Sequence, residues 1–129
     1  MEETESIVCD TDVLIEYLDR GNIDVAKKLL LLGMENLFIS SVTASELIVG
    51  AQDKDHFDRL IKFVSKIKIL PITIEVSNTH FELVKQFSLS HRIQVQDALI
   101  AATVINSRYK LYTLNTSDFR FIPGLELVL

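Results

Sequence analysis

Short apolar runs alternate with amphipathic segments along the whole chain. Runs of four or five residues, rich in Ile, Val and Leu, predict buried strands at 6–9, 37–40, 67–70, 110–114 and 125–128. Between them, apolar residues at helical spacing predict helices at 11–21, 23–32, 41–51, 54–66, 75–90 and 96–107. Because strands alternate with helices and no Asn-Gly hairpin turn joins two strands, we expect an α/β fold. The specific expectation is a three-layer α/β/α sandwich with a mainly parallel central sheet of four to five strands.

The apolar positions of the predicted helices indicate which faces form the core. In each of the predicted helices 54–66 and 75–90, apolar residues at approximately helical spacing form one face. Leu60 belongs to this face in the first of them and Phe81 in the second. Four apolar residues of the first two helices fit either the core, which we favour, or a groove for a partner's helix. They are Tyr17, Leu18, Leu30 and Leu31.

Composition places the chain among compact globular proteins. With 129 residues, 48% of them hydrophobic, residues 1–129 are expected to form one domain with a substantial core. Cys9 is the only cysteine, so no internal disulfide forms, which suits a reducing, cytoplasmic compartment. The acidic start of the chain predicts no targeting segment. The longest apolar runs, 29–32 and 98–105, are far short of the ~20 residues of a membrane helix.

The net charge of −5 argues against loose nucleic-acid binding driven by a basic surface. It does not exclude an enzyme that acts on nucleic acids. Carboxylates that hold metal cations make the formal charge negative, while the loaded site is nearly neutral.

Several of the acids fall where the predicted strands and helices meet. Asp10 ends the first strand, with Asp12 two residues further on, and Glu46 lies in the first turn after the second strand. Asn115 and Asp118 follow the fourth strand. In a parallel sheet these positions share one edge, and Asp97 joins them if the N-terminus of its helix points there. Oxygen-rich clusters of this kind are what Mg²⁺ or Mn²⁺ requires.

Each of these residues also has an ordinary structural interpretation. Asp10 fits a helix N-cap, and Glu46 fits the acid of a capping box with Thr43. Asp97 fits a favourable interaction with a helix dipole, while Asn115 and Asp118 fit a turn. Taken together these interpretations are less convincing, because several acids that converge without a cation repel one another.

Three segments, in order, resemble the motifs of PIN-domain ribonucleases. They are CDTDVLIEYL, SSVTASELIVGA and QDALIAATVINSRYKLYTLNTSDF. By pattern the chain is most similar to the VapC-type toxins of toxin–antitoxin pairs, and the resemblance covers nearly the whole chain. It implies a Rossmann-like α/β/α sandwich, usually a homodimer, that cleaves RNA with Mg²⁺ or Mn²⁺. A toxin of this kind also has a cognate antitoxin protein as its partner.

The resemblance also implies roles for individual residues. Asp10, Glu46 and Asp97 match the acids that bind the metal, and Asn115 or Asp118 stands at the place of the fourth acid. Thr11 and Thr113 match hydroxyl groups that hold the carboxylates in place. Asp12, beside this set, is expected to support it.

Other candidate residues carry weaker signals. Arg92 and Arg120 are the basic residues that we expect to hold RNA phosphates. The three histidines are scattered and are interpreted as surface or partly buried, and Cys9 as a core residue rather than a nucleophile. Two alternatives stay open: a PIN module that binds RNA or a protein without cleaving, and a different α/β enzyme such as a phosphatase with an acidic site.

Overall fold

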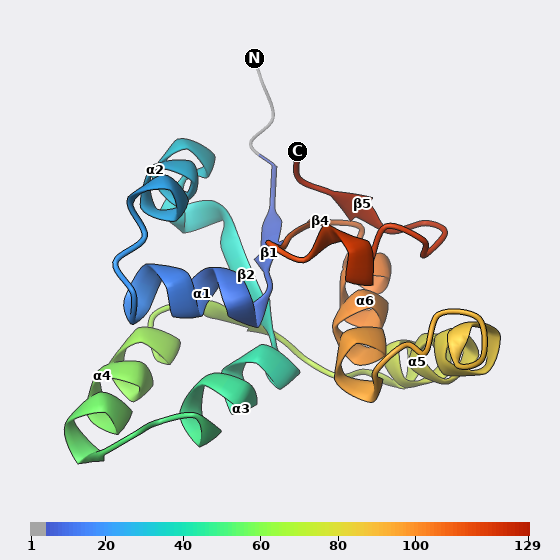
Figure 1. The fold of residues 1–129 in the computed structure, drawn as a ribbon, viewed down its shortest axis with the longest axis horizontal. Coiled ribbons are helices and arrows are strands. Elements are labelled where there is room, and N and C mark those ends of the chain that lie inside the picture. The colour runs from blue at the N-terminus through green and yellow to red at the C-terminus, as the bar shows by residue number, and fades with distance from the viewer. Residues whose placement is uncertain (1–4) are drawn as a thin grey trace.

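The computed structural model describes residues 5–129, which form a central sheet with helices on both faces (Figure 1). The strands in this part of the chain are β1 (Ile7–Cys9), β2 (Leu37–Ser40), β3 (Lys68–Leu70), β4 (Lys110–Tyr112) and β5 (Glu126–Leu127). The helices are α1 (Thr11–Leu18), α2 (Ile23–Leu32), α3 (Ser41–Val49), α4 (Lys54–Val64), α5 (Ile74–Phe87) and α6 (Val95–Ser107). Two 3₁₀ turns, η1 (Met34–Asn36) and η2 (Thr116–Asp118), complete the described elements.

All strand pairs are parallel, and the strand order is β3-β2-β1-β4-β5. The chain therefore winds outward from β1 in both directions, and the order reverses between β1 and β4. In open parallel sheets the crevice at such a reversal, outside the carboxyl ends of the strands, is where ligands bind. Cys9 pairs with Tyr112, so Asp10 and Thr113 leave the two strands side by side.

Alternate side chains of the strands pack into two separate cores. Ile7 and Cys9 of β1 face one core and Val8 faces the other, as the period of two along a strand requires. Helices α1, α2 and α4 cover the first face, and α5 and α6 cover the second, as Figure 1 shows. The predicted α/β sandwich with a parallel sheet is therefore confirmed, with five strands in the described chain. Cys9 is buried, as we expected.

Some apolar and polar residues lie where the sequence did not place them. Leu30 and Leu31 are 71% and 81% exposed, so the core assignment we favoured for them is wrong. The reason is that α2 buries the face of Val25 and Leu29, and the next two residues turn away from it. Phe81 is likewise exposed, whereas His56 is buried, with its ring bonded to Asp19 and to a backbone N–H.

Several element ends also differ from the predicted bounds. The first helix ends at Leu18 rather than at residue 21, and the strand predicted for 110–114 ends at Tyr112. After Leu18 the chain forms a turn, whereas after Tyr112 it is irregular, with a bend at Leu114 next to the crevice.

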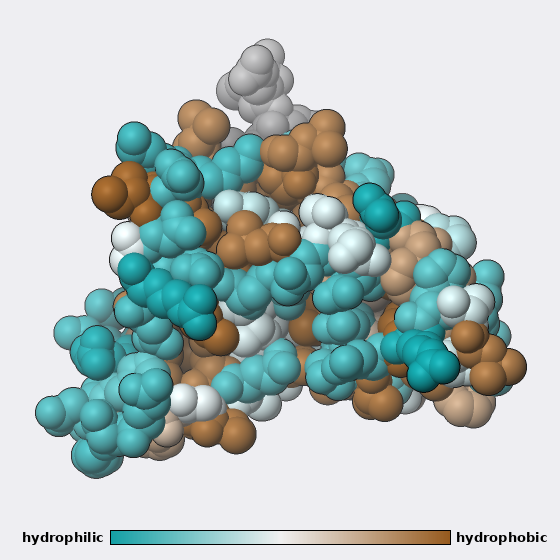
Figure 2. Space-filling view, viewed as in Figure 1, coloured by the Kyte–Doolittle hydropathy of each residue, from teal (hydrophilic) through white to brown (hydrophobic). Residues whose placement is uncertain are grey.

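Figure 2 shows hydrophobic residues in brown over α2 at the upper left of this face, and further ones over α5 at the lower right. The area between them, where α1, α6 and η2 approach one another, is mostly hydrophilic. Among residues 5–129, no helix has both the length and the apolar character that crossing a bilayer requires.

Candidate active site

Asp10 lies at the carboxyl end of β1, where it is 7% exposed. Its backbone is extended and its side chain caps α1, because Oδ1 accepts a hydrogen bond of 2.8 Å from the backbone N–H of Thr11. Oδ2 accepts a second one, also 2.8 Å, from the hydroxyl of Thr113 after β4. The carboxylate is thus held from both of the strands that border the crevice, and the N-cap interpretation is part of its role.

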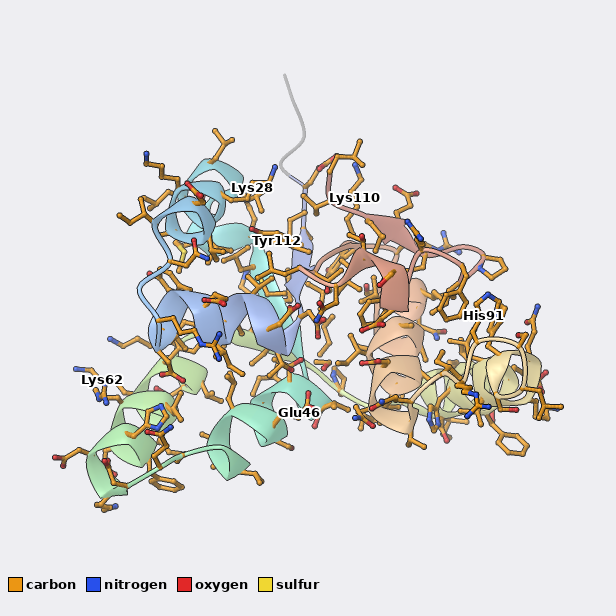
Figure 3. All side chains as sticks on the ribbon, in the orientation of Figure 1. Lys28, Glu46, Lys62, His91, Lys110 and Tyr112 are labelled. Carbon is orange, nitrogen blue, oxygen red and sulfur yellow. The ribbon has the colours of Figure 1, made fainter. Side chains whose placement is uncertain are left out.

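Glu46 reaches the same crevice from α3. Its Oε1 accepts a hydrogen bond of 2.6 Å from the hydroxyl of Thr11, across the gap between α3 and α1. Figure 3 labels Glu46 on α3, below the end of β1. The cap of α3 is instead Ser40, whose Oγ accepts from the backbone N–H of Thr43 at 3.0 Å. The capping-box interpretation of Glu46 is therefore wrong, and its side chain belongs to the crevice.

Asp12 is tied to the segment after β4. Its Oδ2 accepts hydrogen bonds from the amide group of Asn115 at 2.9 Å and from the backbone N–H of Leu114 at 3.2 Å. Its Oδ1 accepts from the backbone N–H of Val13 at 2.7 Å. Since the Asn115 amide group is used to hold Asp12, Asn115 acts on the crevice through that carboxylate. The sequence suggested a supporting role for Asp12 but gave no sign of this partner.

Asp97 and Asp118 complete the group and differ from the other acids. Asp97 lies in the first turn of α6, and Asp118 ends η2. Among the described residues, no hydrogen-bond donor or basic side chain contacts either carboxylate. Their side chains are therefore free to turn toward a ligand.

Electrostatics shows that these acids lie within reach of one another. The pKa of Asp97 is raised from 3.8 to about 6, first by burial and then by the charges of Asp10, Asp118 and Glu46. The pKa of Asp10 is also raised to about 6, by burial and then by Asp12, against the hydrogen bonds from Thr113 and Thr11. The N-terminus of α6 consequently points to the edge that Asp10 occupies, which was the condition for Asp97 to join the site.

Within residues 5–129, no ion pair joins a basic side chain to one of these acids. The ion pairs within residues 5–129 join Arg20 to Glu16, Lys54 to Asp58, His56 to Asp19, Lys85 to Glu82 and Lys110 to Glu5. None of them includes an acid of the crevice. Several uncompensated carboxylates near one another are unfavourable unless protons or cations bind them.

A divalent cation suits this donor set. The available donors are carboxylate oxygens, which hard cations prefer, and hydroxyl groups already orient two of the carboxylates. In the described part of the chain, no three His, Cys, Asp or Glu side chains already meet closely enough to hold an ion. A cation held by three or more of these acids would need side chains to rotate, and Asp97 and Asp118 are not tied by hydrogen bonds to described residues.

Cavities flank the acids on two sides. One, of about 170 Å³, includes Asp97, Asp118 and Arg92 in its walls. Another, of about 280 Å³, includes Asp12 and Asn115. Of the two arginines that the sequence suggested, Arg92 thus lies beside the acids. Arg120 is exposed just after η2 and forms no ion pair with the other described residues.

The remaining nucleophile candidate is excluded by its surroundings. Burial, and then the charge of Asp10, raises the pKa of the Cys9 thiol to about 12. A thiol in this state is not a nucleophile at neutral pH.

Comparison with known sequences gives one family. A model described as PIN domain matches residues 7–123. The chain is 32% identical over 130 residues to Ribonuclease VapC1 of Rickettsia felis, with 95% of this chain and 94% of that protein covered. It is 29% identical over the same length and coverage to Ribonuclease VapC of Rickettsia bellii.

The comparison with solved structures agrees with the comparison of sequences. A chain of a toxin-antitoxin complex from Klebsiella pneumoniae is similar, with a TM-score of 0.79 and 29% identity over 93% of this chain and 95% of that one. A chain of VapBC2 from Rickettsia felis, solved bound to a DNA fragment from its promoter, has a TM-score of 0.81 and 25% identity. There the match covers 95% of this chain and 96% of the other.

Proposed function

We propose that this chain, which belongs to the PIN domain family and within it to the VapC-type ribonuclease toxins, is an endoribonuclease that needs Mg²⁺ or Mn²⁺. The observation that carries the metal requirement is the group of acids at the crevice, which no basic side chain compensates among the described residues. The proposed ligands are Asp10, Glu46, Asp97 and Asp118. RNA is the substrate, and residues 1–129 act as one domain.

The contacts of each residue support a role for it in the proposed reaction. A divalent ion held by the acids supplies Lewis-acid activation of water for attack on a phosphodiester. Thr113 and Thr11 hold Asp10 and Glu46 in place through their hydroxyl groups. No protein nucleophile is required, which suits the inert Cys9.

Asp118, rather than Asn115, is proposed as the fourth acid. The Asn115 amide group is already bonded to Asp12 at 2.9 Å, whereas no donor in the described chain occupies Asp118. The charge of Asp118 also contributes to the raised pKa of Asp97, which supports a shared role for the two carboxylates. Asn115 is then a positioning residue that keeps Asp12 at the border of the site.

The partners are proposed from the family and from the surface. The similar structures include toxin–antitoxin complexes, which supports an antitoxin protein as partner. The exposed Leu30 and Leu31 on α2 give such a partner an apolar surface to cover. A homodimer is the proposed assembly of the toxin itself.

RNA cleavage tests the function directly. The purified protein should cleave RNA with Mg²⁺ or Mn²⁺ and stop when EDTA is added, while nitrophenyl phosphate should not be hydrolysed. Asp10→Asn and Asp97→Asn should lose activity while circular dichroism shows that they stay folded. Asp58→Asn, an exposed acid on α4, is the matched control and should keep full activity. Cleavage that persists in EDTA or in both site variants would contradict the proposal.

A module that binds RNA without cleaving is the second candidate. It is favoured by one observation: in residues 5–129 no three acids meet at metal-ligand distance. Calorimetric titration with Mn²⁺ separates the two candidates. Binding that is absent at millimolar metal favours the inert module, and binding that Asp97→Asn removes favours the nuclease.

A further inference from the structure

A cavity of about 170 Å³ is lined on one side by two of the acids, Asp97 and Asp118. Its other walls come from the connection between α5 and α6, from Ser117 in η2 and from Phe121 after η2. Besides Ile93 and Ser117, they carry aromatic, cationic and amide side chains: His91, Phe121, Arg92 and Gln94. A ligand in the cavity would therefore lie next to two of the proposed metal ligands.

The aromatic wall is a rigid stack with a free outer surface. The His91 ring lies parallel to Phe121, with 4.0 Å between ring centroids and 12° between planes. Phe87, which is buried in the core, packs edge to face against both rings. Its ring centroid lies 5.5 Å from that of His91 and 5.0 Å from that of Phe121. A hydrogen bond of 2.8 Å between Ser90 Oγ and His91 Nδ1 fixes the imidazole further. Because Phe121 covers one face of the exposed His91, the other face remains for a planar ligand.

Arg92 adds a positive charge whose backbone is held in an unusual conformation. Its φ is +49°, in the left-handed region that side chains rarely adopt. Its side chain is exposed and forms no ion pair with any other described residue. A conformation of this kind persists only where the surroundings impose it, and such residues concentrate at functional sites.

A planar stacking surface next to a free arginine matches the chemistry of a nucleotide. Unpaired bases stack on aromatic side chains, and arginine binds the phosphate. Gln94 uses Oε1 to accept a bond from Gln96 Nε2 at 2.8 Å, which leaves its own amide N–H groups for a base edge. Figure 3 shows His91 on the far side of α6 from Glu46, so this subsite extends the acid site in one direction.

We propose that this cavity binds one unpaired nucleobase of the RNA, adjacent to the phosphate that is cleaved. The base stacks on His91, and Arg92 contacts the phosphate of the same nucleotide. The subsite selects RNA whose cleavage position lies in an unpaired segment. This inference rests on the proposed ribonuclease activity, so its test also includes a binding measurement that needs no cleavage.

Two arginine variants provide a matched pair. Arg108, at the other end of α6, also has a positive φ, +63°, but it caps the helix and lies outside the cavity. Glycine relieves the backbone at either position, so Arg92→Gly and Arg108→Gly should both keep or raise Tm. Only Arg92→Gly should weaken RNA binding, measured by fluorescence anisotropy in EDTA with an unpaired oligonucleotide. Its slope of log affinity against log salt should fall by about 1.

His91 is tested by removing and restoring the ring. Stacking on one base corresponds to roughly 5- to 150-fold in affinity, so His91→Ala should raise KM by that order while kcat changes little. His91→Phe keeps the stacking face and should restore KM. An RNA substrate with an abasic nucleotide beside the cleaved bond should raise the KM of the parent protein by a similar factor. In His91→Ala the same substrate should raise KM no further, because the stacking contact is already lost. Phe57→Ala, an exposed aromatic on α4, is the control.

The outcomes are distinct. If the parent protein binds RNA in EDTA and Arg92→Gly weakens this binding, the subsite holds even where no cleavage is seen and the proposed activity fails. If the protein cleaves RNA but Arg92→Gly and Arg108→Gly behave alike and His91→Ala keeps its KM, the subsite is wrong and the activity stands. Variants that bind RNA normally but lose inhibition by an antitoxin would show that the cavity takes a protein segment, which also overturns the inference.

Discussion

The surroundings of Asp97 change its pKa, and through it the stability of the protein. Asp97 lies near three other carboxylates, with no donor among the described residues to compensate its charge, and its pKa is raised to about 6. A carboxyl group with a raised pKa in the folded state binds more protons there than in the unfolded chain. Its contribution to stability is therefore present below about pH 4 and is lost as the pH rises through about 6.

This sign predicts an effect of pH on the metal-free protein. With EDTA present, the free energy of unfolding of the parent protein should fall between about pH 4 and pH 7. The free energy of unfolding of Asp97→Asn should fall by less over the same range. Since Asp97 is half-buried and solvent screens its charge, the free energy of unfolding of the variant at pH 7 should exceed that of the parent protein by on the order of 1 kcal/mol. Urea denaturation at both pH values measures this, with Asp58→Asn as the control. Equal pH profiles for the parent protein and Asp97→Asn would contradict the electrostatic argument.

Asn115 and Asp118 are expected to differ in their effect on activity. Asp118 is a proposed ligand, whereas Asn115 acts through Asp12. Loss of a side chain that only orients the site typically costs 10–100-fold, so Asn115→Ala should lower kcat/KM by roughly that factor. Asp118→Asn should lower it further, and Mn²⁺ binding should weaken with it. A larger loss in Asn115→Ala than in Asp118→Asn would reverse the assignment.

At the scale of single elements, side-chain caps set where several helices begin. Asn22, Ser40, Asp53 and Thr73 each accept a hydrogen bond from a backbone N–H in the first turn of α2, α3, α4 and α5 respectively. The start of α6 has no such cap. Asp97, in the first turn of α6, instead has its pKa raised by burial and by the charges of Asp10, Asp118 and Glu46, as the proposed role in the crevice requires.

The cap of α4 gives a stability prediction. Asp53 accepts a hydrogen bond of 2.8 Å from the backbone N–H of His56, whose buried ring joins α4 to Asp19 after α1. Asp53→Ala should therefore destabilise the protein by about 1 kcal/mol. Asp58→Ala removes only an exposed pair with Lys54 on the same helix and should change stability by less than about 0.5 kcal/mol. Thermal unfolding of both variants checks the difference, and equal losses would exclude the capping role.

At the scale of the whole molecule, the proposed metal site would couple metal binding to folding through its acids. A cation that binds only the folded state stabilises it by about 2.7 kcal/mol at a concentration of 100 times Kd. The Tm of the protein should therefore rise with Mn²⁺ or Mg²⁺ and return to its starting value with EDTA. In Asp97→Asn the rise should be much smaller, while Asp58→Asn should match the parent protein. A Tm that does not respond to either metal would contradict the proposed site.

The assembly is a second property of the whole molecule. The proposed homodimer has twice the chain mass of 14.6 kDa. Apolar side chains are exposed on α5 and beside it, among them Phe81, Ile74 and Leu89, and a partner that covers them gains the free energy of apolar burial. Light scattering of the purified protein should give the mass of the dimer. A mass of one chain at micromolar concentration would exclude the proposed assembly.

The amino-acid sequence by itself determined the class of fold and most of its elements. Strands and helices form from local patterns of apolar residues, and α2 and β2 begin and end where the pattern predicts. The positions of Asp10, Glu46 and Asp97 also predicted that these acids converge, because a parallel sheet brings the carboxyl ends of its strands to one edge, and in the structure they lie near one another. Helix and strand ends were less accurate, since caps and turns depend on single hydrogen bonds.

Only the tertiary structure decided how the polar residues are paired. The sequence offered no reason to connect Asn115 with Asp12, 103 positions away, whose carboxylate accepts the hydrogen bond of the Asn115 amide group. It also could not show that His91 stacks on Phe121 beside the acids. Local patterns are set by neighbours along the chain, whereas these contacts join segments that only the winding of β1 and β4 around the crevice brings together.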